Sequence, residues 1–336
     1  MYLKKMTGIL GFLCCNLVAF GQMDQIVEPR MSLYNPAMAG SERLLSAAVV
    51  YQQLSAGIPG QPVEQGLALH SLGKSNSVGL GLTMRHVSMG SRNLMLASGQ
   101  YAYWMESGRL DISIGLELGI VGSFQNWDNL NFRDPASSDP VFSDQMGSRF
   151  ALDAGVGMFL RSARSYAGFS VKHLFEPQLA EAAYPQWSNK IGRRFYGLAG
   201  TRLNAPQLRG YLEATLIVTN MQFLSALTRD SRQLATTNSP VLTSLRLAYR
   251  FHPDIQVGGA FRWSVDNYGA EGWDVIGDLG SWFVKWRFQD RFLIGAAYGT
   301  PLNNRRLTIQ NKLEFLFGVL FAGKDEDRAG PEDVYF

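Results

Sequence analysis

Histidine and serine are the side chains in this sequence best suited to catalysis, but their spacing matches none of the common site types. The histidines do not form the H-x-x-x-H or H-E-x-x-H spacing of a helical zinc site, and no G-x-S-x-G elbow presents a serine nucleophile. We therefore expect no metal, no cofactor and no enzymatic activity, and we expect the histidines to be polar residues near the rims or in the interior of the fold. They are His70, His86, His173 and His252.

An acidic stretch between residues 126 and 144 contains oxygen donors of the kind that calcium prefers. The donors do not follow the twelve-residue spacing of an EF-hand loop, and two turn-forming pairs, Asp134-Pro135 and Asp139-Pro140, interrupt them. A calcium site and a solvated acidic loop both stay open as interpretations, and the second is favoured. The donors are Asp128, Asn129, Asn131, Asp134, Asp139 and Asp144.

Residues 1–21 have the features of a secretory signal peptide. Two lysines precede an apolar run from Ile9 to Phe20, and the residues before Gln22 suit a cleavage site. A lipoprotein signal is the alternative, but the residues before Cys15 are too large for it. Cleavage before Gln22 would remove Cys14 and Cys15, the only cysteines, which excludes a disulfide scaffold and a cysteine nucleophile in the mature chain.

Composition and charge narrow the class of protein further. The 336 residues are 46% apolar and 18% charged, which is too apolar for a disordered chain. Without the signal peptide, 29 basic residues face 28 acidic ones, so we expect no general attraction to nucleic acid. After the signal there is no run of 18 apolar residues that would form a transmembrane helix.

Apolar residues instead recur at every second position, which is the pattern of β-strands with one apolar and one polar face. Most of the segments with this pattern are longer than the five or six residues of a typical soluble strand, and they approach the roughly 9–11 residues that cross a bilayer at a tilt. The predicted strands are residues 44–54, 62–72, 77–87, 94–105, 109–124, 149–161, 165–173, 191–203, 208–219, 241–251, 254–265, 278–288, 291–299 and 307–321.

The predicted connections alternate between short and long, as in outer-membrane barrels with short periplasmic turns and longer extracellular loops. We therefore predict an all-β fold, a transmembrane antiparallel up-and-down β-barrel of about 14 strands with both termini in the periplasm. A soluble β-sandwich would explain the alternation, but not the signal peptide, the long strands and the loop asymmetry together. The longer connections are predicted at residues 55–61, 88–93, 125–148, 174–190, 220–240, 266–277 and 300–306.

The two faces of the predicted strands differ in chemistry. Charges of both signs on the inward face would either pair and fill the interior or line a water channel, and aromatic residues near strand ends are expected at the membrane interface. The inward charges are Arg85, Asp111, Glu117, Asp153, Arg161, Glu213, Arg246, Arg250, Arg262, Lys285, Arg287, Lys312 and Glu314. The interface aromatics are Tyr101, Tyr103, Trp104, Trp263, Trp282, Trp286 and Tyr298.

The stretch Tyr34-Asn35-Pro36-Ala37-Met38-Ala39-Gly40 resembles the Y-N-P-A-x-A-G opening of the PorP/SprF family, outer-membrane proteins of the type IX secretion and gliding apparatus of Bacteroidota. Gly57-Ile58-Pro59-Gly60 and Asp139-Pro140-Val141-Phe142 are similar to later motifs of that family, in the same order. Gln52 and Ser55 stand where the family commonly has Arg and Trp, and from about residue 205 only the strand pattern matches.

The resemblance implies a non-enzymatic component that supports the export of an adhesin-like cargo protein and its anchoring at the cell surface through the cargo's C-terminal type IX sorting domain. It also implies periplasmic ring components and a peptidoglycan-binding lipoprotein as partners, besides outer-membrane lipid. The barrel alone leaves a second function open, an outer-membrane channel or hydrophobic-solute transporter.

The expected organisation is a signal peptide (1–21), an N-terminal periplasmic segment (22–43), the barrel (44–321) and a charged tail (322–336) that is either solvated or a docking peptide. Asn35-Pro36 favours a turn, and the small residues after it allow close packing. We expect the N-terminal segment at or inside the periplasmic mouth, where it plugs the barrel, docks a partner or caps the floor. The candidate residues are Tyr34, Asn35, Pro36, Ala37, Ala39, Gly40, Gly57, Pro59, Gly60, Asp139 and Pro140.

Overall fold

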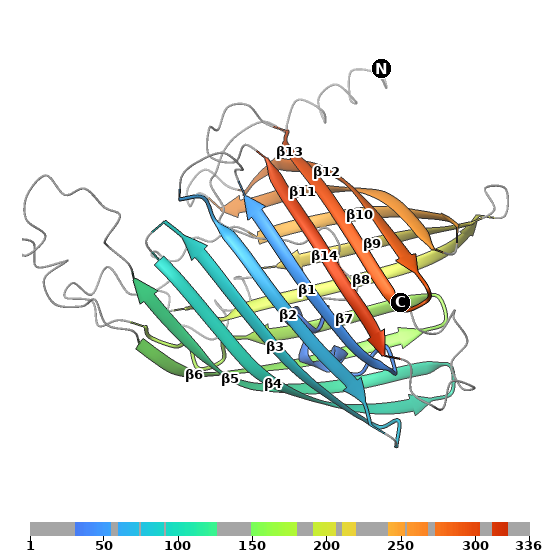
Figure 1. Ribbon diagram of the computed structural model, residues 1–336, viewed down its shortest axis with the longest axis horizontal. Coiled ribbons are helices and arrows are strands. Elements are labelled where there is room, and N and C mark those ends of the chain that lie inside the picture. Colours follow the sequence, from blue (N-terminus) through green and yellow to red (C-terminus); the bar gives the residue numbers. More distant parts are fainter. Residues whose placement is uncertain are drawn as a thin grey trace, which may run out of the picture.

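The chain folds into one closed antiparallel barrel of fourteen strands (Figure 1). Strands that are neighbours in sequence pair with each other, and β1 (Leu45–Leu54) pairs with β14 (Lys312–Phe321) to close the sheet. Closure leaves no unpaired strand edge in lipid, and the predicted fold class is confirmed. The computed structural model describes residues 31–54, 60–73, 75–90, 92–125, 149–179, 191–205, 210–219, 241–252, 254–267, 273–302 and 311–321.

Two short helical turns precede the barrel, α2 (Met31–Tyr34) and the 3-10 turn η2 (Pro36–Met38). Among the described residues, no helix is long and apolar enough to span a membrane. The other strands are β2 (Val63–Leu72), β3 (Val78–Met89), β4 (Arg92–Ser107), β5 (Leu110–Gln125), β6 (Arg149–Ser162), β7 (Ser165–Lys172), β8 (Arg194–Ala205), β9 (Gly210–Thr219), β10 (Val241–His252), β11 (Ile255–Asn267), β12 (Trp273–Phe288) and β13 (Phe292–Pro301).

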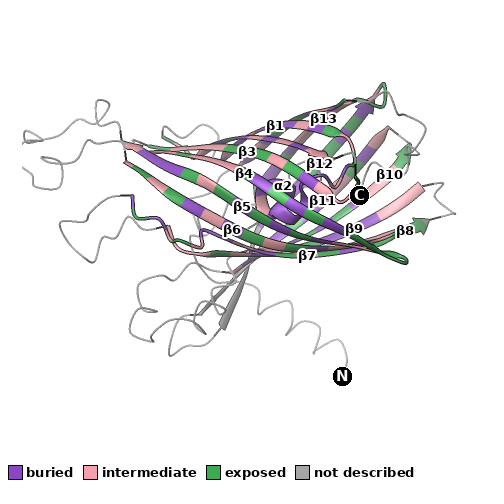
Figure 2. Ribbon diagram, turned by 90° about the horizontal axis from the view of Figure 1, so that it is seen from below, coloured by how far each residue is buried: buried purple, intermediate pink, exposed green. Residues whose placement is uncertain are grey.

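Side chains along the strands alternate between the outer and the inner face of the barrel. On β5, Leu116 and Leu118 point outward and are 55% and 62% exposed, whereas Glu117 between them is 9% exposed. More and less buried residues alternate in the same way along other described strands, most clearly along β14 (Figure 2). Apolar side chains are stable on the outside because lipid tails take the place of water there. The predicted two-residue period is therefore confirmed.

The barrel has two different rims. We call the rim where β2 joins β3, β4 joins β5 and β6 joins β7 the short-turn rim; β1 begins and β14 ends at the same rim, since Leu45 pairs with Phe321. The opposite end is the long-loop rim. Most of its connections, such as residues 126–148 between β5 and β6, lie outside the described residues.

The connection between β3 and β4 departs from the prediction of a longer loop at residues 88–93. Strand β3 continues to Met89, β4 starts at Arg92, and these two residues pair directly. Gly90 has a φ of 59°, a left-handed conformation that a tight hairpin turn needs and that glycine adopts without strain. The prediction was wrong here because polar residues near the strand ends were assigned to the loop.

Strand β12 also differs from its prediction, since it begins at Trp273 and not at residue 278. The reason is pairing, because β11 extends to Asn267 and that residue pairs with Trp273. A register shift between Arg262 and Trp263 lets the strands continue past an irregularity. The other predicted strands each correspond to an observed strand, with ends that move by a few residues.

Candidate functional site

Residues 31–43, called the inner segment below, lie inside the barrel. Asn35, Ala37 and Ala39 are each 0% exposed. The turn α2 contacts β2 and β3, while η2 contacts β4, β5 and β6, and both views show the helical turns enclosed by the strands (Figures 1 and 2). The inner segment ends at the short-turn rim, where β1 begins.

Asn35 holds the turn in the middle of the inner segment. Its side chain Oδ1 accepts a hydrogen bond from the Ala37 amide at 3.0 Å, so that Asn35 is the N-cap of η2. Pro36 follows at the first position of the turn, where its missing N–H costs nothing. The Asn35 Nδ2 donates to the carbonyl oxygen of Met158 on β6 at 3.0 Å. One side chain therefore shapes the turn and attaches it to the wall.

The backbone of the inner segment approaches the wall at glycines. A side chain at any of these positions would collide with the segment, because Cβ contacts under about 3 Å are not tolerated. The sequence therefore leaves space in the wall where the inner segment lies. A Cβ atom would be 2.0 Å from Asn35 Oδ1 if built on Gly157, 2.1 Å from the Ala37 nitrogen on Gly115 and 2.0 Å from the Ala39 carbonyl oxygen on Gly79.

Five wall side chains donate hydrogen bonds to backbone carbonyl oxygens of the inner segment. A bond of this kind contributes about 1 kcal/mol net, and a buried carbonyl left without one costs more. Together the five bonds fix the path of the segment along its whole length. They run from Gln100 Nε2 to Ser32 (2.7 Å), Ser170 Oγ to Tyr34 (2.7 Å), Ser113 Oγ to Ala37 (2.7 Å), Trp104 Nε1 to Ala39 (2.8 Å) and Arg161 Nη1 to Ser41 (2.8 Å).

Trp104 corrects one of the predictions, which placed it among the aromatic residues at the membrane interface. Its side chain is buried inside the barrel, edge-on to Phe159 and below the Arg161 guanidinium. Tyr101 and Tyr103 on the same strand are exposed on the outside. Successive side chains of a strand point to opposite faces, so Trp104, which follows the outward-facing Tyr103, points inward. The prediction for this residue was wrong.

Charged residues surround the inner segment where it reaches the short-turn rim. Arg161 Nη2 and Arg43 Nη2 approach the same carboxylate oxygen of Asp111 at 2.8 Å and 3.5 Å. The Gly40 amide donates to His70 Nδ1 at 3.3 Å. A small hollow opens beside Gly40 and Arg43, and the Arg43 side chain is 38% exposed. This end of the inner segment is thus partly accessible from the rim.

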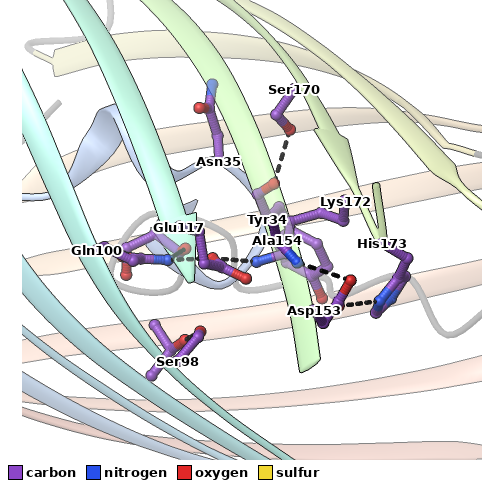
Figure 3. Close-up of polar contacts among 12 residues, drawn as sticks. Tyr34, Asn35, Ser98, Gln100, Glu117, Asp153, Ala154, Ser170, Lys172 and His173 are labelled. Carbon is purple, nitrogen blue, oxygen red and sulfur yellow. Dashed lines mark hydrogen bonds and ion pairs between the residues drawn. The ribbon is translucent and has the colours of Figure 1, made fainter. Parts of the chain in front are cut away.

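A polar cluster surrounds the other end of the inner segment (Figure 3). Gln100 Nε2 donates to Glu117 Oε2 at 2.7 Å, and the Lys172 ammonium group forms an ion pair with the same oxygen. Next to Lys172, His173 Nδ1 lies 2.5 Å from Asp153 Oδ2. All five side chains are buried. Buried charges of this kind persist because each has a partner of opposite charge or a hydrogen bond.

Charged side chains also fill the interior along β9 to β14. The Arg246 guanidinium lies 4.4 Å from the ring centre of Phe283 and 3.7 Å from the Glu213 carboxylate. Lys312 and Glu314 are both 0% exposed, with 3.4 Å between Nζ and Oε2. Such complete burial shows that these charges are packed against protein and not against water. These four inward charges are therefore buried inside the barrel.

The structure brings together six of the eleven candidate residues, Tyr34, Asn35, Pro36, Ala37, Ala39 and Gly40, in the inner segment. Gly60 lies apart from them near the β3–β4 turn, where its carbonyl oxygen accepts a hydrogen bond from the Gly90 amide at 2.9 Å. The other four candidates, Gly57, Pro59, Asp139 and Pro140, lie outside the described residues, as do the acidic stretch 126–144, the signal peptide and the tail.

The histidines occupy three different environments. His70 and His173 are buried inside, and His252 is exposed at the short-turn rim. His86 is half-buried and lies on the outer face of β3, two residues after the outward-facing Met84. Within the described ranges, no group of three or more His, Cys, Asp or Glu residues could hold a metal ion.

Sequence reasoning missed the wall residues that bind the inner segment. Gln100, Ser113 and Ser170 are uncharged and were not among the candidate residues. A signal was present, because Gly79, Gly115 and similar glycines occupy inward positions of strands that otherwise favour larger side chains. Glycine at an inward position indicates that another backbone approaches closely, although the sequence does not tell which one.

Comparison with known proteins identifies the family. The model of a family described as type IX secretion system membrane protein PorP/SprF matches residues 22–319. The chain belongs to the PorP/SprF family. It is therefore a membrane component of the type IX secretion system, and the predicted resemblance is confirmed. No curated protein matches the chain.

Solved barrels resemble this PorP/SprF member in architecture. The toluene transporter TodX of Pseudomonas putida is 10% identical, with a TM-score of 0.50, and the match covers 91% of this chain and 98% of TodX. A FadL homologue of Pseudomonas aeruginosa is 13% identical, with a TM-score of 0.45 and coverage of 89% and 94%. At 10% identity, the likeness to TodX concerns the barrel fold alone.

Proposed function

We propose that this PorP/SprF member supports the export of an adhesin-like cargo protein and anchors it at the cell surface through the cargo's C-terminal sorting domain. The observation that carries the proposal is the family match over residues 22–319. A secretion component of this kind acts by binding, and the proposed role is not enzymatic.

The packed interior supports a binding role over a channel or hydrophobic-solute transporter. A porin-like passage needs a continuous water-filled lumen. In the described part of this barrel, the inner segment lies against β2 to β6, and charges such as the Lys312–Glu314 ion pair are buried elsewhere in the interior. We propose that the inner segment is the plug of the barrel.

The asymmetry of the rims supports an orientation. If the short-turn rim faces the periplasm, as in other outer-membrane barrels, both ends of the barrel sheet, Leu45 and Phe321, are on that side. The periplasmic ring components and the peptidoglycan-binding lipoprotein would then meet the short-turn rim. The cargo would meet the longer loops at the opposite rim, on the cell exterior.

Co-purification tests the proposed cargo interaction directly. An affinity-tagged copy of the full chain, isolated from outer membranes in mild detergent, should retain a large secreted protein that ends in a type IX sorting domain. An unrelated tagged barrel from the same membranes is the control. Recovery of the tagged chain with no protein of that class, under conditions that preserve other membrane complexes, would contradict the proposal.

A second experiment tests the role of the inner segment. Replacing Asn35 and Pro36 together with alanine removes the cap and the preset first residue of η2. We expect this variant to form a barrel with less cargo on the cell surface. Normal barrel assembly, normal cargo display and an unchanged set of co-purified partners would together show that the segment is neither a plug nor a docking element.

A further inference from the structure

The polar cluster connects the inner segment to the end of β7 at the long-loop rim through contacts between buried groups. Gln100 Nε2 donates both to the Ser32 carbonyl oxygen and to Glu117 Oε2, each at 2.7 Å. The Lys172 ammonium group pairs with the same Glu117 oxygen. Since Lys172 is the last residue of β7, a continuous series of polar contacts leads from the inner segment to the start of the loop that follows β7.

The orientation of the Gln100 amide is dictated by its neighbours. Both groups within reach of Nε2, a carbonyl oxygen and a carboxylate oxygen, accept hydrogen bonds and cannot donate them. Rotating the amide would place its oxygen against two other oxygens. Gln100 therefore serves as a double donor, and its position depends on Ser32 and Glu117 at the same time.

The end of β7 is held at two consecutive residues. Lys172 reaches across to Glu117 on β5, and His173, which has a φ of 59°, reaches to Asp153 on β6. The Leu174 amide then donates to the Ala154 carbonyl oxygen at 2.9 Å. On the same inward face of β7, Ser170 donates directly to the Tyr34 carbonyl oxygen. The point where the loop leaves the barrel is thus attached both to the wall and to the inner segment.

We propose that Gln100, Glu117 and Lys172 form a relay that couples the position of the inner segment at Ser32 to the conformation at the start of the loop after β7. A buried carboxylate that loses its cation is strongly destabilised, so the three groups keep or lose their arrangement together. A change at His173 or Lys172 on the long-loop side is transmitted to Ser32. The inference rests on the proposed plug and on the proposed orientation, but not on the identity of the cargo.

Thiol labelling of the full chain in detergent tests the relay. Residues 16–336 contain no cysteine, so a single introduced cysteine is the only thiol in that range. Ser32→Cys reports the accessibility of the inner segment next to Gln100, and Ser41→Cys reports its accessibility at the short-turn rim. Ser32 Oγ has no hydrogen-bond partner within the described residues, so this reporter removes no contact seen there. The rate of maleimide labelling is read for each peptide by mass spectrometry, and heat-dependent gel mobility confirms that the barrel is folded.

Lys172→Met should raise the labelling rate of the Ser32→Cys reporter by about tenfold or more, because it leaves Glu117 buried without its cation. The labelling rate of the Ser41→Cys reporter should stay within about twofold of the parent rate, because that end of the segment is held by Arg161. The double variant Glu117→Gln with Lys172→Met removes both charges and should return most of the protection. Ser98→Ala is the matched control, since Ser98 bonds Thr83 on the neighbouring strand and takes no part in the relay.

His173→Ala tests the coupling from the loop side, because His173 contacts Asp153 and not the inner segment. We expect faster labelling of the Ser32→Cys reporter in this variant too. If the Ser32→Cys reporter is labelled at the same rate in Lys172→Met and in the parent, the proposed relay is wrong. An equal rise in the labelling rates of the Ser32→Cys and Ser41→Cys reporters would also contradict it. A change in Lys172→Met without one in His173→Ala would overturn the coupling to the loop. None of these outcomes depends on cargo export, which is tested separately.

Discussion

At the scale of single residues, Asn35 both shapes the inner segment and attaches it to the barrel. Its amide caps η2 through Oδ1 and binds the Met158 carbonyl oxygen through Nδ2, and Gly157 leaves the space in which Oδ1 lies. Few other side chains have both an acceptor and a donor at this length. The residue therefore specifies both the turn and its attachment, and its substitutions should separate the two contributions.

Asn35→Ala should lower the free energy of unfolding by about 1–3 kcal/mol, because it removes the cap and the hydrogen bond from Asn35 Nδ2 to the Met158 carbonyl oxygen. Asn35→Asp keeps an acceptor for the Ala37 amide, but it loses the donor and also places a carboxylate at a fully buried position beside the Met158 carbonyl oxygen, which adds a desolvation cost. Urea unfolding in detergent, followed by heat-dependent gel mobility, measures both variants. If Asn35→Ala is as stable as the parent, Asn35 does not hold the segment.

Gly157→Ala should destabilise the barrel by about 1–3 kcal/mol through overpacking, because the new Cβ would lie 2.0 Å from Asn35 Oδ1. Gly99→Ala is the matched control, since no atom lies within 4 Å of a Cβ built at Gly99. The same unfolding measurement compares them. Equal stability of the two variants would mean that the inner segment is not packed against β6.

At the scale of elements, the sequence predicted the strands well and their ends less well. The alternation of apolar and polar residues located all fourteen strands, because successive side chains face lipid and the barrel interior in turn. It did not reveal the tight β3–β4 turn, which depends on the conformation of Gly90, or the early start of β12, which depends on pairing with Asn267. Both features are set by contacts between strands, which a single strand's pattern does not contain.

The inner segment was predicted only in part. Its position near the short-turn rim followed from a turn-forming pair and small residues next to the first strand. Its partners did not follow, because Trp104, Ser113 and Arg161 come from different strands that meet only after the barrel closes. Glycines at inward positions indicated a close approach, but one sequence does not identify which backbone approaches.

Trp104→Phe tests how strongly the inner segment is attached to β4. A smaller aromatic ring remains, and the donor to the Ala39 carbonyl oxygen is lost. We expect a cost of about 1–3 kcal/mol from the unsatisfied buried carbonyl, in addition to the lost packing of the indole. Trp282→Phe on the exposed outer face is the control and should change stability by less than about 0.5 kcal/mol. Equal effects in the two variants would show that the Trp104 hydrogen bond contributes no stability.

At the scale of the whole molecule, the barrel combines an apolar outer surface with an interior in which many polar and charged side chains are buried. Figure 2 shows buried residues on every labelled strand. This combination suits the proposed binding role, because many inward-facing polar and charged side chains are buried against protein. The 46% apolar fraction therefore serves contact with lipid more than a soluble core.

Planar bilayers test the closed interior. Purified protein should insert and produce no stable conductance steps, because in the proposed plugged barrel the inner segment and the buried ion pairs block the lumen. A general porin in the same bilayers is the positive control. Steady conductance comparable to that of the porin would contradict a plugged barrel and would favour the channel function.

The central claim, that this PorP/SprF member serves a type IX cargo, is tested most directly by deleting its gene and comparing the proteins of the cell surface and the medium by quantitative proteomics. The account predicts that at least one protein with a type IX sorting domain is lost from the surface, either released into the medium or not exported, and that the intact gene restores it. An unchanged surface and medium, in cells whose type IX system is otherwise active, would contradict the account.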